Sequence, residues 1–332
     1  MRAVRWHGRG DVRVERVPTA PDPGPREVRV RVAWCGLCGT DVHEYRSGPF
    51  YVAAPPMIIG HEIAGWVDAV GADVPGLAEG DLVGLNALLP CGSCAQCARG
   101  AYHLCAIFGH VGFTAAGGLA ELVTVPAAMV VPAPAGMDSA VAALGEPFAV
   151  AMHGIRQAGR PRGTRCVVVG AGTIGLAAAM LLRADGNEVT VTDVAEPRLR
   201  MAARLGFGTI AAGPAPVVFE CAGAPAAPGT AFGLAEPGGL VVLMGLSETP
   251  STVDFSVVVL REIRVIGSMS HLAEADLAPA LAFLAAHEDA ARQLVTARIP
   301  LRDTVSHGLD VLAGPEGAEH AKILVQVHGG DR

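Results

Sequence analysis

The 332-residue sequence has no long apolar run and no basic cluster, and we expect neither a membrane-spanning segment nor a secretory leader. Apolar residues make up 51% of it, yet no run approaches the roughly 18 consecutive apolar residues of a transmembrane helix. Its formal net charge of −7, without a cluster of Lys and Arg, argues against a nucleic-acid partner. The opening run MRAVRWHGRGDVRVERV alternates like a strand pair and has no apolar stretch of the secretory kind. We therefore expect a cytoplasmic protein that binds neither membranes nor nucleic acids.

Internal repeats and low-complexity tails are also missing, and a chain of this length suits two domains with substantial cores. Free thiols are abundant instead, with eight cysteines in all. Thiols that serve as metal ligands suit a reducing compartment, which agrees with the cytoplasmic expectation.

Four cysteines gather within the run CGSCAQCARGAYHLC. Cys91, Cys94, Cys97 and Cys105 follow the spacing C-x2-C-x2-C-x7-C, so four thiolates can close around one tetrahedral zinc without an open position. A disulfide framework is a poorer interpretation, because the chain is far larger than the small domains that need such cross-links. Buried free cysteines are disfavoured by the Gly, Ser, Gln and Ala residues between them. We predict a structural zinc site.

A second group of potential metal ligands lies in three separate runs. Cys38 opens CGTDVH, His61 and Glu62 end IIGHE, and Glu146 lies in GEPFAV. One thiolate, one imidazole and a carboxylate form the mixed ligand set of a catalytic zinc, whose fourth position stays open for water or substrate. Each piece is weak alone. Their joint occurrence with the four-cysteine run predicts a catalytic zinc site.

A dinucleotide-binding turn is the third signal. The run RCVVV at 165–169 reads as a buried parallel strand, and Gly170, Gly172 and Gly175 follow it in GAGTIG before a helical pattern. These glycines allow the tight turn, the approach of backbone to pyrophosphate and close packing of helix on strand. Asp193 ends the next strand about 20 residues later, where a carboxylate accepts both ribose hydroxyls and repels a 2′-phosphate. NAD is therefore favoured over NADP.

Taken together, these residues resemble the zinc-dependent medium-chain alcohol dehydrogenases over essentially the whole chain. The runs VRWHG, VAWCGLCGTDVHEY, GHE and EPFAVAMHGIR are similar to the branch of (R,R)-butanediol and sorbitol dehydrogenases. Glu146 stands where the classical alcohol dehydrogenases carry a ligand cysteine. The tripeptide GTD follows Cys38, and His43 comes two residues after Asp41; both features are typical of this branch. Threonine 3-dehydrogenases share CGTDVH and HLC and are close relatives of this branch.

The resemblance implies an α/β protein in which a catalytic domain with a distorted, GroES-like β-barrel accompanies a Rossmann doubly wound parallel sheet. We expect the catalytic domain at 1–147 and 271–332, and the NAD-binding domain at 148–270. The last strand of the catalytic domain is expected at 322–327. The strands of the Rossmann sheet are expected at 165–169, 188–192, 216–220, 239–244 and 263–267.

The same resemblance implies a route for the proton. In that family a hydroxyl after the ligand cysteine passes the alcohol proton through the cofactor ribose to a histidine, and Thr40 and His43 occupy these positions. Asp41 is expected to orient His61 through its other ring nitrogen. Taken alone, Thr40 would be interpreted as a turn-capping hydroxyl and His43 as a solvated helix residue.

The expected cofactors are NAD and two zinc ions, one catalytic and one structural. We favour Cys38, His61 and Glu146 as the catalytic ligands, with Glu62 acting in catalysis as an alternating or outer carboxylate. Which of the two carboxylates is bound at rest is left open by the sequence. The residues predicted to bind NAD are Gly170, Gly172, Ile174, Gly175, Asp193, Arg198, Gly245 and Ser268.

Departures from the family bear on the substrate. Sorbitol dehydrogenases carry an aromatic residue where Glu44 stands, and an Arg–Tyr pair where Ser270 and His271 stand. Loss of that arginine removes a multivalent hydrogen-bond donor for a long polyol, so a small vicinal diol, acyloin or secondary alcohol is favoured over sorbitol. The segment 49–57, which borders the pocket in the family, differs from that of butanediol dehydrogenases.

Alternatives remain open. The same chemistry on an amino alcohol, an aminocyclitol or threonine would need a carboxylate partner for the amine, which Glu44 could supply. A non-catalytic protein that binds zinc and NAD is a remote alternative. The resemblance also implies a homodimer or homotetramer built partly on the dinucleotide domain, acting on a small alcohol or ketone.

A connection of the dinucleotide domain is unusually short. The family has a further helix between its third and fourth strands, whereas here only residues 211–215 separate GFGTI from PVVFE. Five residues reach at most about 18 Å, and the crossover must pass two strands, about 14 Å sideways, while returning along their length. We predict a shortened or frayed third strand and no helix between it and the fourth.

Overall fold

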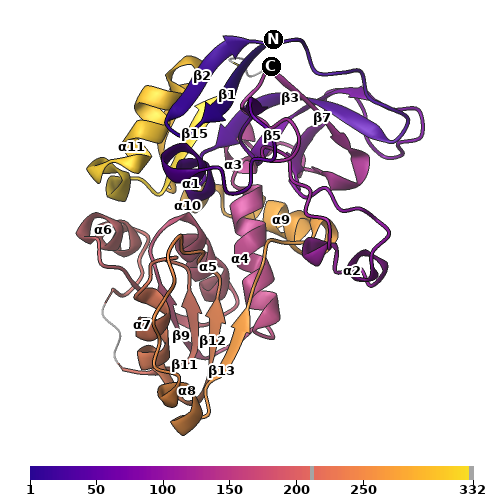
Figure 1. Cartoon of the computed structure of the whole chain (residues 1–332). Helices are drawn as coiled ribbons and strands as arrows, with labels where there is room; N and C mark the ends of the chain where they lie inside the picture. Colours follow the sequence, from indigo (N-terminus) through magenta and orange to yellow (C-terminus); the bar gives the residue numbers. More distant parts are fainter. Residues whose placement is uncertain (210–212, 329–332) are drawn as a thin grey trace. The chain divides into compact units, whose positions relative to one another are not determined.

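The computed structural model describes residues 1–209 and 213–328 (Figure 1). The chain divides into two compact units, one made of Met1–Ala149 with His271–Arg332 and the other of Val150–Ser270. The smaller unit thus begins at Val150 and ends at Ser270, whereas the sequence predicted a domain from 148 to 270. Among the described helices, none is both long and apolar enough to span a membrane.

The larger unit is dominated by antiparallel strands. One sheet runs in the order β14-β15-β3-β5-β6-β8, with β7 also paired to β3, and a smaller sheet runs β2-β1-β4. These strands are β1 (Arg2–Gly8), β2 (Asp11–Arg16), β3 (Glu27–Gly36), β4 (Met57–Ile58), β5 (Glu62–Val70), β6 (Leu82–Leu85), β7 (Leu122–Pro126), β8 (Val130–Pro132), β14 (Val295–Pro300) and β15 (Lys322–Gln326).

Strand β3 shows why this unit folds around one core. Val28, Val30 and Val32 are fully buried, while the intervening Arg29 and Arg31 are less buried, which is the period of two of a strand with one core face. The same face contacts apolar residues of β1, β5, β6 and β15, so the strands close over a shared core. The predicted barrel-like catalytic domain is confirmed, and its last predicted strand is β15.

Short helices link the strands of the larger unit. They are α1 (Gly39–Ser47), α2 (Ala95–Ala98), α3 (Ser139–Ala142), α9 (Ala278–Ala286), α10 (Glu288–Arg292) and α11 (Asp310–Ala313). Helix α4 (Gly145–Gln157) begins in this unit and continues past its boundary at Ala149. Further single turns are η1 (Tyr102–Leu104), η2 (Ala127–Met129), η3 (Ala273–Leu277), η4 (Leu301–Asp303), η5 (Thr304–Leu309) and η6 (Pro315–Glu319).

The smaller unit is a parallel sheet in the order β10-β9-β11-β12-β13, visible in the lower half of Figure 1. Its strands are β9 (Arg165–Val169), β10 (Glu188–Thr192), β11 (Ala215–Glu220), β12 (Ala235–Leu243) and β13 (Arg264–Gly267). Its helices are α5 (Thr173–Ala184), α6 (Glu196–Arg204), α7 (Ala227–Leu234) and α8 (Ser256–Leu260). The chain moves to opposite sides of β9 to form β10 and β11, so the dinucleotide crevice of a doubly wound sheet lies at their carboxyl ends. The predicted Rossmann sheet is confirmed.

The third strand of the usual Rossmann order is reduced to one bridge between Thr190 and Gly208. This confirms the shortened strand that the brief connection predicts. Between the end of α6 at Arg204 and the start of β11 at Ala215, the described residues form no helix. Residues 210–212 of the same connection lie outside the described part of the chain.

Candidate functional site

Strand pairing brings the thiol and imidazole of the candidate catalytic site together. Cys38 follows the end of β3 and caps helix α1, while His61 directly precedes β5. Strands β3 and β5 are antiparallel, with Gly36 opposite Glu62. This register places the start of α1 beside the start of β5, although more than twenty residues of chain separate them.

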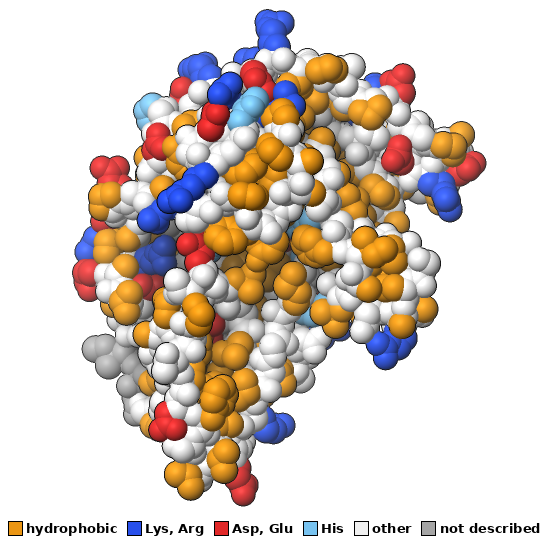
Figure 2. Space-filling view, in the orientation of Figure 1, with side chains coloured by type: hydrophobic (Ala, Val, Ile, Leu, Met, Phe, Trp, Pro, Cys, Tyr) orange, Lys and Arg blue, Asp and Glu red, His pale blue; other side chains and the backbone are white. Residues whose placement is uncertain are grey.

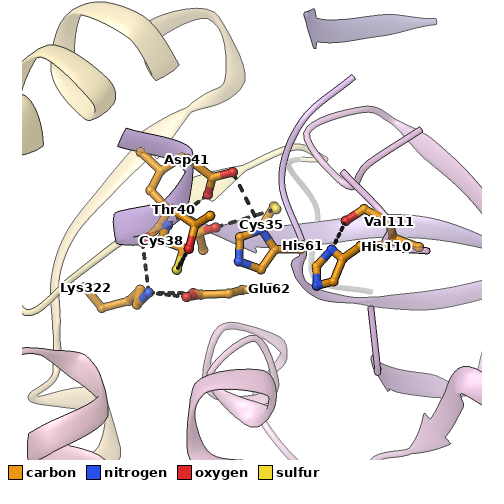
Figure 3. Close-up of polar contacts among 11 residues, drawn as sticks. Cys35, Cys38, Thr40, Asp41, His61, Glu62, His110, Val111 and Lys322 are labelled. Carbon is orange, nitrogen blue, oxygen red and sulfur yellow. Dashed lines mark hydrogen bonds and ion pairs between the residues drawn. The ribbon is translucent and has the colours of Figure 1, made fainter. Parts of the chain in front are cut away.

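Cys38, His61 and Glu62 form a compact group of potential ligands (Figure 3). Their donor atoms all lie within 4.8 Å of one another. His61 is 4% exposed and Glu62 is 2% exposed, so these two side chains are shielded from water, while Cys38 is partly exposed. One sulfur, one imidazole nitrogen and one carboxylate oxygen at such spacing fit a zinc ion.

Asp41 organises this group from the first turn of α1. Its Oδ2 accepts a hydrogen bond from the Cys38 backbone N–H at 2.9 Å, and its Oδ1 lies 3.6 Å from His61 Nδ1. Burial disfavours a charged imidazole, but Asp41 and Cys38 outweigh it and raise the pKa of His61 well above its usual value. With Nδ1 turned toward Asp41, Nε2 is the ring nitrogen left to face Cys38 (Figure 3).

Lys322 was not predicted from the sequence and is the main addition to the site. Its Nζ lies 2.6 Å from both carboxylate oxygens of Glu62 and donates to the Leu37 carbonyl at 2.9 Å. Both charged side chains are only 2% exposed. The pairing of β15 with β3 carries this lysine to the ligand group (Figure 3). Glu62 therefore already has a buried cationic partner.

Glu146 lies outside the compact group, although the sequence favours it as a ligand. It occupies the first turn of α4, and its Oε1 is 3.7 Å from His271 Nδ1. Burial, opposed in part by His61, raises the pKa of its carboxyl to about 7. His271, which is 1% exposed, is thus a second residue near the site whose part was not predicted.

The predicted relay residues share helix α1. The Thr40 hydroxyl lies 3.6 Å from Cys38 Sγ, next to the ligand group. His43 follows three residues later, and residues at this spacing occupy the same side of a helix. The structure thus places Thr40 at the group and His43 one turn further along.

Glu44 has a structural position rather than the open one that recognition of an amine needs. It is fully buried, and its carboxylate accepts hydrogen bonds from the backbone N–H groups of Phe50 and Tyr51. The carboxylate is therefore occupied in holding the segment after α1. Its suggested role as partner of a substrate amine is not supported.

The four-cysteine loop has the geometry of a tetrahedral metal site. The sulfur separations are 3.5 Å for Cys94–Cys97, 3.9 Å for Cys94–Cys105 and 4.0 Å for Cys91–Cys97. A regular tetrahedron with Zn–S bonds of about 2.3 Å has sulfur atoms about 3.8 Å apart. All four thiols are free, and these separations are far too long for disulfide bonds. The donor set fits a zinc ion.

The glycines after β9 have the conformations that the dinucleotide motif needs. Gly170 has φ +104°, and a side chain there would approach Ala222. A Cβ on Gly175 would lie 1.8 Å from the Gly170 carbonyl oxygen, so only glycine allows helix α5 to pack so closely on β9. Gly172 faces open space, which leaves room for a phosphate at the N-terminus of α5.

Asp193 closes the same turn from the end of β10. Its Oδ2 accepts from the Ala171 N–H at 2.7 Å and its Oδ1 from the Ala195 N–H at 2.8 Å. Arg198 Nη1 lies 3.8 Å from Oδ2. A carboxylate has more acceptor sites than these backbone groups occupy, so Asp193 can still accept from ribose hydroxyls.

The remaining predicted cofactor residues lie at carboxyl ends of the parallel strands or at the start of α5. Gly245 follows β12, Ser268 follows β13, and Ile174 is in the first turn of α5. Glu220, which was not predicted, ends β11 and is 1% exposed. Its carboxylate accepts from the N–H groups of Ala222, Gly223 and Gly245, and so ties together the loops after β11 and β12.

Charges of both signs are mixed on one face of the molecule. On the face shown in Figure 2, the Lys and Arg side chains are dispersed among acidic and apolar ones rather than gathered in one patch. A nucleic-acid site typically needs such a patch. No such patch of Lys and Arg side chains is visible on the face in Figure 2.

Comparisons with known proteins identify the family of the chain. The family of the alcohol dehydrogenase GroES-like domain matches residues 24–135, and the zinc-binding dehydrogenase family matches residues 209–286. A sorbitol dehydrogenase of Halalkalibacterium halodurans is 32% identical over 311 residues, which cover 87% of this chain and 89% of that protein. The (R,R)-butanediol dehydrogenase of Saccharomyces cerevisiae is 34% identical over 234 residues, and the match spans 62% of this chain but only 61% of the yeast protein.

A solved structure supports the fold. A zinc-binding dehydrogenase from Sinorhizobium meliloti 1021, bound to NADP, is similar with a TM-score of 0.87 and 29% sequence identity. The similarity covers 98% of this chain and 99% of that one.

Proposed function

This chain belongs to the zinc-dependent medium-chain alcohol dehydrogenases, and we propose that it transfers a hydride between a small secondary alcohol and NAD. Family membership establishes an oxidoreductase that acts on CH–OH groups with zinc and a nicotinamide cofactor. The substrate, the preference for NAD and the roles of individual residues are our proposal. It rests on one observation above all: a compact thiol–imidazole–carboxylate group and an intact dinucleotide turn occur in the same chain.

The catalytic zinc would be held by Cys38, His61 and one carboxylate. When bound, it supplies a Lewis acid that lowers the pKa of the alcohol hydroxyl. Asp41 keeps His61 in the orientation and tautomer of a ligand, because a carboxylate beside Nδ1 leaves Nε2 for the metal. Burial of His61 and Glu62 limits their contact with water and strengthens the electrostatic interactions between them and their neighbours.

Glu146 remains the carboxylate that we favour as ligand. Glu62 is the nearer of the two to Cys38 and His61, but both of its oxygens are engaged by Lys322. A carboxylate paired with a buried ammonium is a weaker donor to a cation. Glu146 instead has the imidazole of His271 at ion-pair distance. In this proposal Glu146 binds the metal at rest, and Glu62 is the carboxylate that exchanges with it.

Thr40 and His43 would carry the alcohol proton away from the buried group. The Thr40 hydroxyl can accept the proton from substrate while donating its own, since a hydroxyl has both capacities. His43, one helical turn along α1, has ring nitrogens that can accept the proton in turn.

The four-cysteine loop would hold a second, structural zinc. Ser93, by its backbone N–H and hydroxyl, lowers the pKa of Cys91 to about 6. Burial and the neighbouring Cys94 thiol raise that of Cys97 to about 12. The four thiols therefore do not all lose their protons unless a cation balances the negative charge of the thiolates. A bound zinc ion would supply that positive charge. Such a site stabilises the loop without taking part in the reaction.

NAD rather than NADP is the proposed cofactor, because a 2′-phosphate beside Asp193 would be repelled and would lose the ribose hydrogen bonds. We expect the unmodified enzyme to favour NAD by at least about tenfold in kcat/KM, equivalent to about 1.4 kcal/mol. Asp193→Ser with Val194→Arg should narrow or reverse this ratio, since Val194 is fully exposed and can be replaced by a phosphate-binding side chain. Val194→Arg alone is the control and should keep most of the preference. Equal use of both cofactors by the wild type would contradict the assignment.

Homo-oligomerisation is proposed from the edge of the smaller unit. Strand β13 pairs with β12 on one side, and Val265 on it is 37% exposed. Nearby in sequence, Phe255, Val259 and Leu260 expose 67%, 73% and 82% of their surface. An open strand edge with exposed apolar side chains favours association with a second copy. Light scattering should give the mass of a dimer or tetramer, which Leu260→Glu should reduce; a monomeric wild type would contradict this.

The function is tested by a screen of NADH fluorescence with zinc-loaded, metal-analysed protein. The panel contains butane-2,3-diol, acetoin, sorbitol, threonine and a cyclitol, each assayed in the chemically allowed direction. Turnover of small diols or acyloins with NAD supports the proposal. Preference for threonine or an aminocyclitol would favour the amine-bearing alternative, and lack of any turnover would favour a non-catalytic binding protein.

A further inference from the structure

A row of aromatic rings borders the His61 ring inside the larger unit. The centroid of the Phe113 ring is 5.1 Å from that of His61, and the His110 ring meets His61 edge-on at 5.3 Å. Phe108 stacks on His110 at 5.6 Å, and Tyr51 packs 6.3 Å from Phe108. Few aromatic residues exist in this chain, only 5% of the total, so their gathering here is a local feature.

Exposure along this row changes steadily from inside to outside. Phe113 and His110 are 3% and 8% exposed, whereas Phe108 and Tyr51 are each 39% exposed. The row therefore leads from the protein surface to the candidate zinc ligands. The organic part of an alcohol bound at those ligands would lie against it.

Glu44 explains how the outer ring is held in place. Its buried carboxylate accepts the backbone N–H groups of Phe50 and Tyr51, and its own carbonyl accepts from the Trp6 indole at 3.0 Å. The two departures from the family, at position 44 and in segment 49–57, are thus one structural feature. The unusual glutamate anchors the unusual segment, which supplies Tyr51.

His110 is the polar group at the inner end of the row. Its Nδ1 lies 2.7 Å from the Val111 carbonyl oxygen, which can only accept, so Nδ1 carries the hydrogen (Figure 3). In the neutral ring, Nε2 then presents a lone pair. The backbone of this segment is pinned on both sides, by Leu89 N–H to the Gly109 carbonyl and by Val111 N–H to the Ala87 carbonyl. The acceptor is held on a rigid support.

We propose that His110 determines substrate specificity by accepting a hydrogen bond from a hydroxyl on the carbon next to the reacting one. This inference rests on the proposed dehydrogenase function and adds a specificity-determining residue to it, the side chain that separates a vicinal diol from a mono-ol of the same shape. The ring centroid of His110 is 5.3 Å from that of His61, so a hydroxyl next to the carbon that reacts at the candidate ligands can come within reach of His110. The aromatic row accommodates the apolar substituent and disfavours a long polyol, whose hydroxyls would be desolvated without partners.

The test compares two substrates of nearly equal shape. 1-Phenylethane-1,2-diol and 1-phenylpropan-1-ol differ by exchange of the second hydroxyl for a methyl group. For the zinc-loaded wild type, the ratio of kcat/KM for diol over mono-ol should be at least about tenfold in favour of the diol. His110→Phe should lower this ratio by about tenfold, because it keeps the ring and removes the acceptor.

Two further variants separate recognition from packing. His110→Gln retains an acceptor at the end of a planar group and should keep part of the preference for the diol. Phe108→Leu removes a stacked ring but leaves His110, so it should weaken both substrates together and leave the ratio unchanged. Zinc content and thermal stability of each variant show that the comparison is made on folded enzyme.

Binding measured without turnover makes the result independent of the proposed reaction. Calorimetric titration of wild type and His110→Phe with 1-phenylethane-1,2-diol should show about tenfold weaker binding to the variant. An unchanged substrate ratio together with unchanged binding would overturn the role of His110. Absence of alcohol oxidation by the wild type, with selective binding of the diol, would instead overturn the dehydrogenase function and leave the recognition role standing.

Discussion

Thr40→Ala is expected to lower kcat by about 10²–10⁴-fold while zinc and NAD stay bound, because it removes the hydroxyl beside Cys38 that would take the alcohol proton. His43→Gln should be milder, since water can replace the outer proton acceptor, and added buffer base or higher pH should restore part of the rate. Stopped-flow measurement of NADH formation, with zinc content and NAD affinity determined in parallel, makes the comparison.

Thr40→Ser is the matched control for this experiment. It keeps a hydroxyl at the same position and should retain activity within about tenfold of the wild type. A Thr40→Ala enzyme with near wild-type kcat would show that the proton leaves by another group, with Glu62 as the nearest candidate.

Metal content gives the second large effect. Elemental analysis should find two zinc ions per chain, and Cys38→Ala should lose one of them together with all activity, since a thiolate ligand of the candidate catalytic site is gone. Cys97→Ser should lose the other zinc and lower the melting temperature, because the binding energy of a structural metal contributes to folding.

Cys221→Ala serves as the control for both cysteine variants. Cys221 lies in the smaller unit and belongs to neither ligand group, so two zinc ions should remain. One zinc ion or none in carefully prepared wild type would contradict the two-site assignment. Loss of both ions in Cys38→Ala would show that the two sites are not independent.

Local motifs were sufficient to predict several parts of this protein. The four cysteines lie within one loop, so their spacing alone constrains the distances between sulfur atoms. The glycine turn lies directly between the strand and the helix that define it in the sequence. The connection before residue 215 is too short to contain a helix, so its length alone predicted the shortened third strand. The strands of the Rossmann sheet were recognised because buried parallel strands read as short apolar runs.

Long-range contacts could not be predicted in the same way. Lys322 meets Glu62 across 260 residues of sequence, and nothing in the run KILVQV marks its first residue as a buried cation. Glu44 was interpreted as a possible partner for a substrate amine, because the sequence does not reveal that the backbone of Phe50 and Tyr51 occupies its carboxylate. His110, one histidine in an apolar run, carried no local signal at all.

The sequence by itself determined the four-cysteine loop, the dinucleotide turn and the fold family, because the motifs that carry them consist of residues close together in the chain whose spacing limits their geometry. Tertiary structure alone decided which carboxylate is paired with Lys322, what Glu44 holds and which rings border His61. The pairing of β15 with β3, and of β3 with β5, brings Lys322 and Glu62 together. The difference is physical: a motif constrains distances within a few residues, whereas contacts between distant segments depend on the packing of the whole unit.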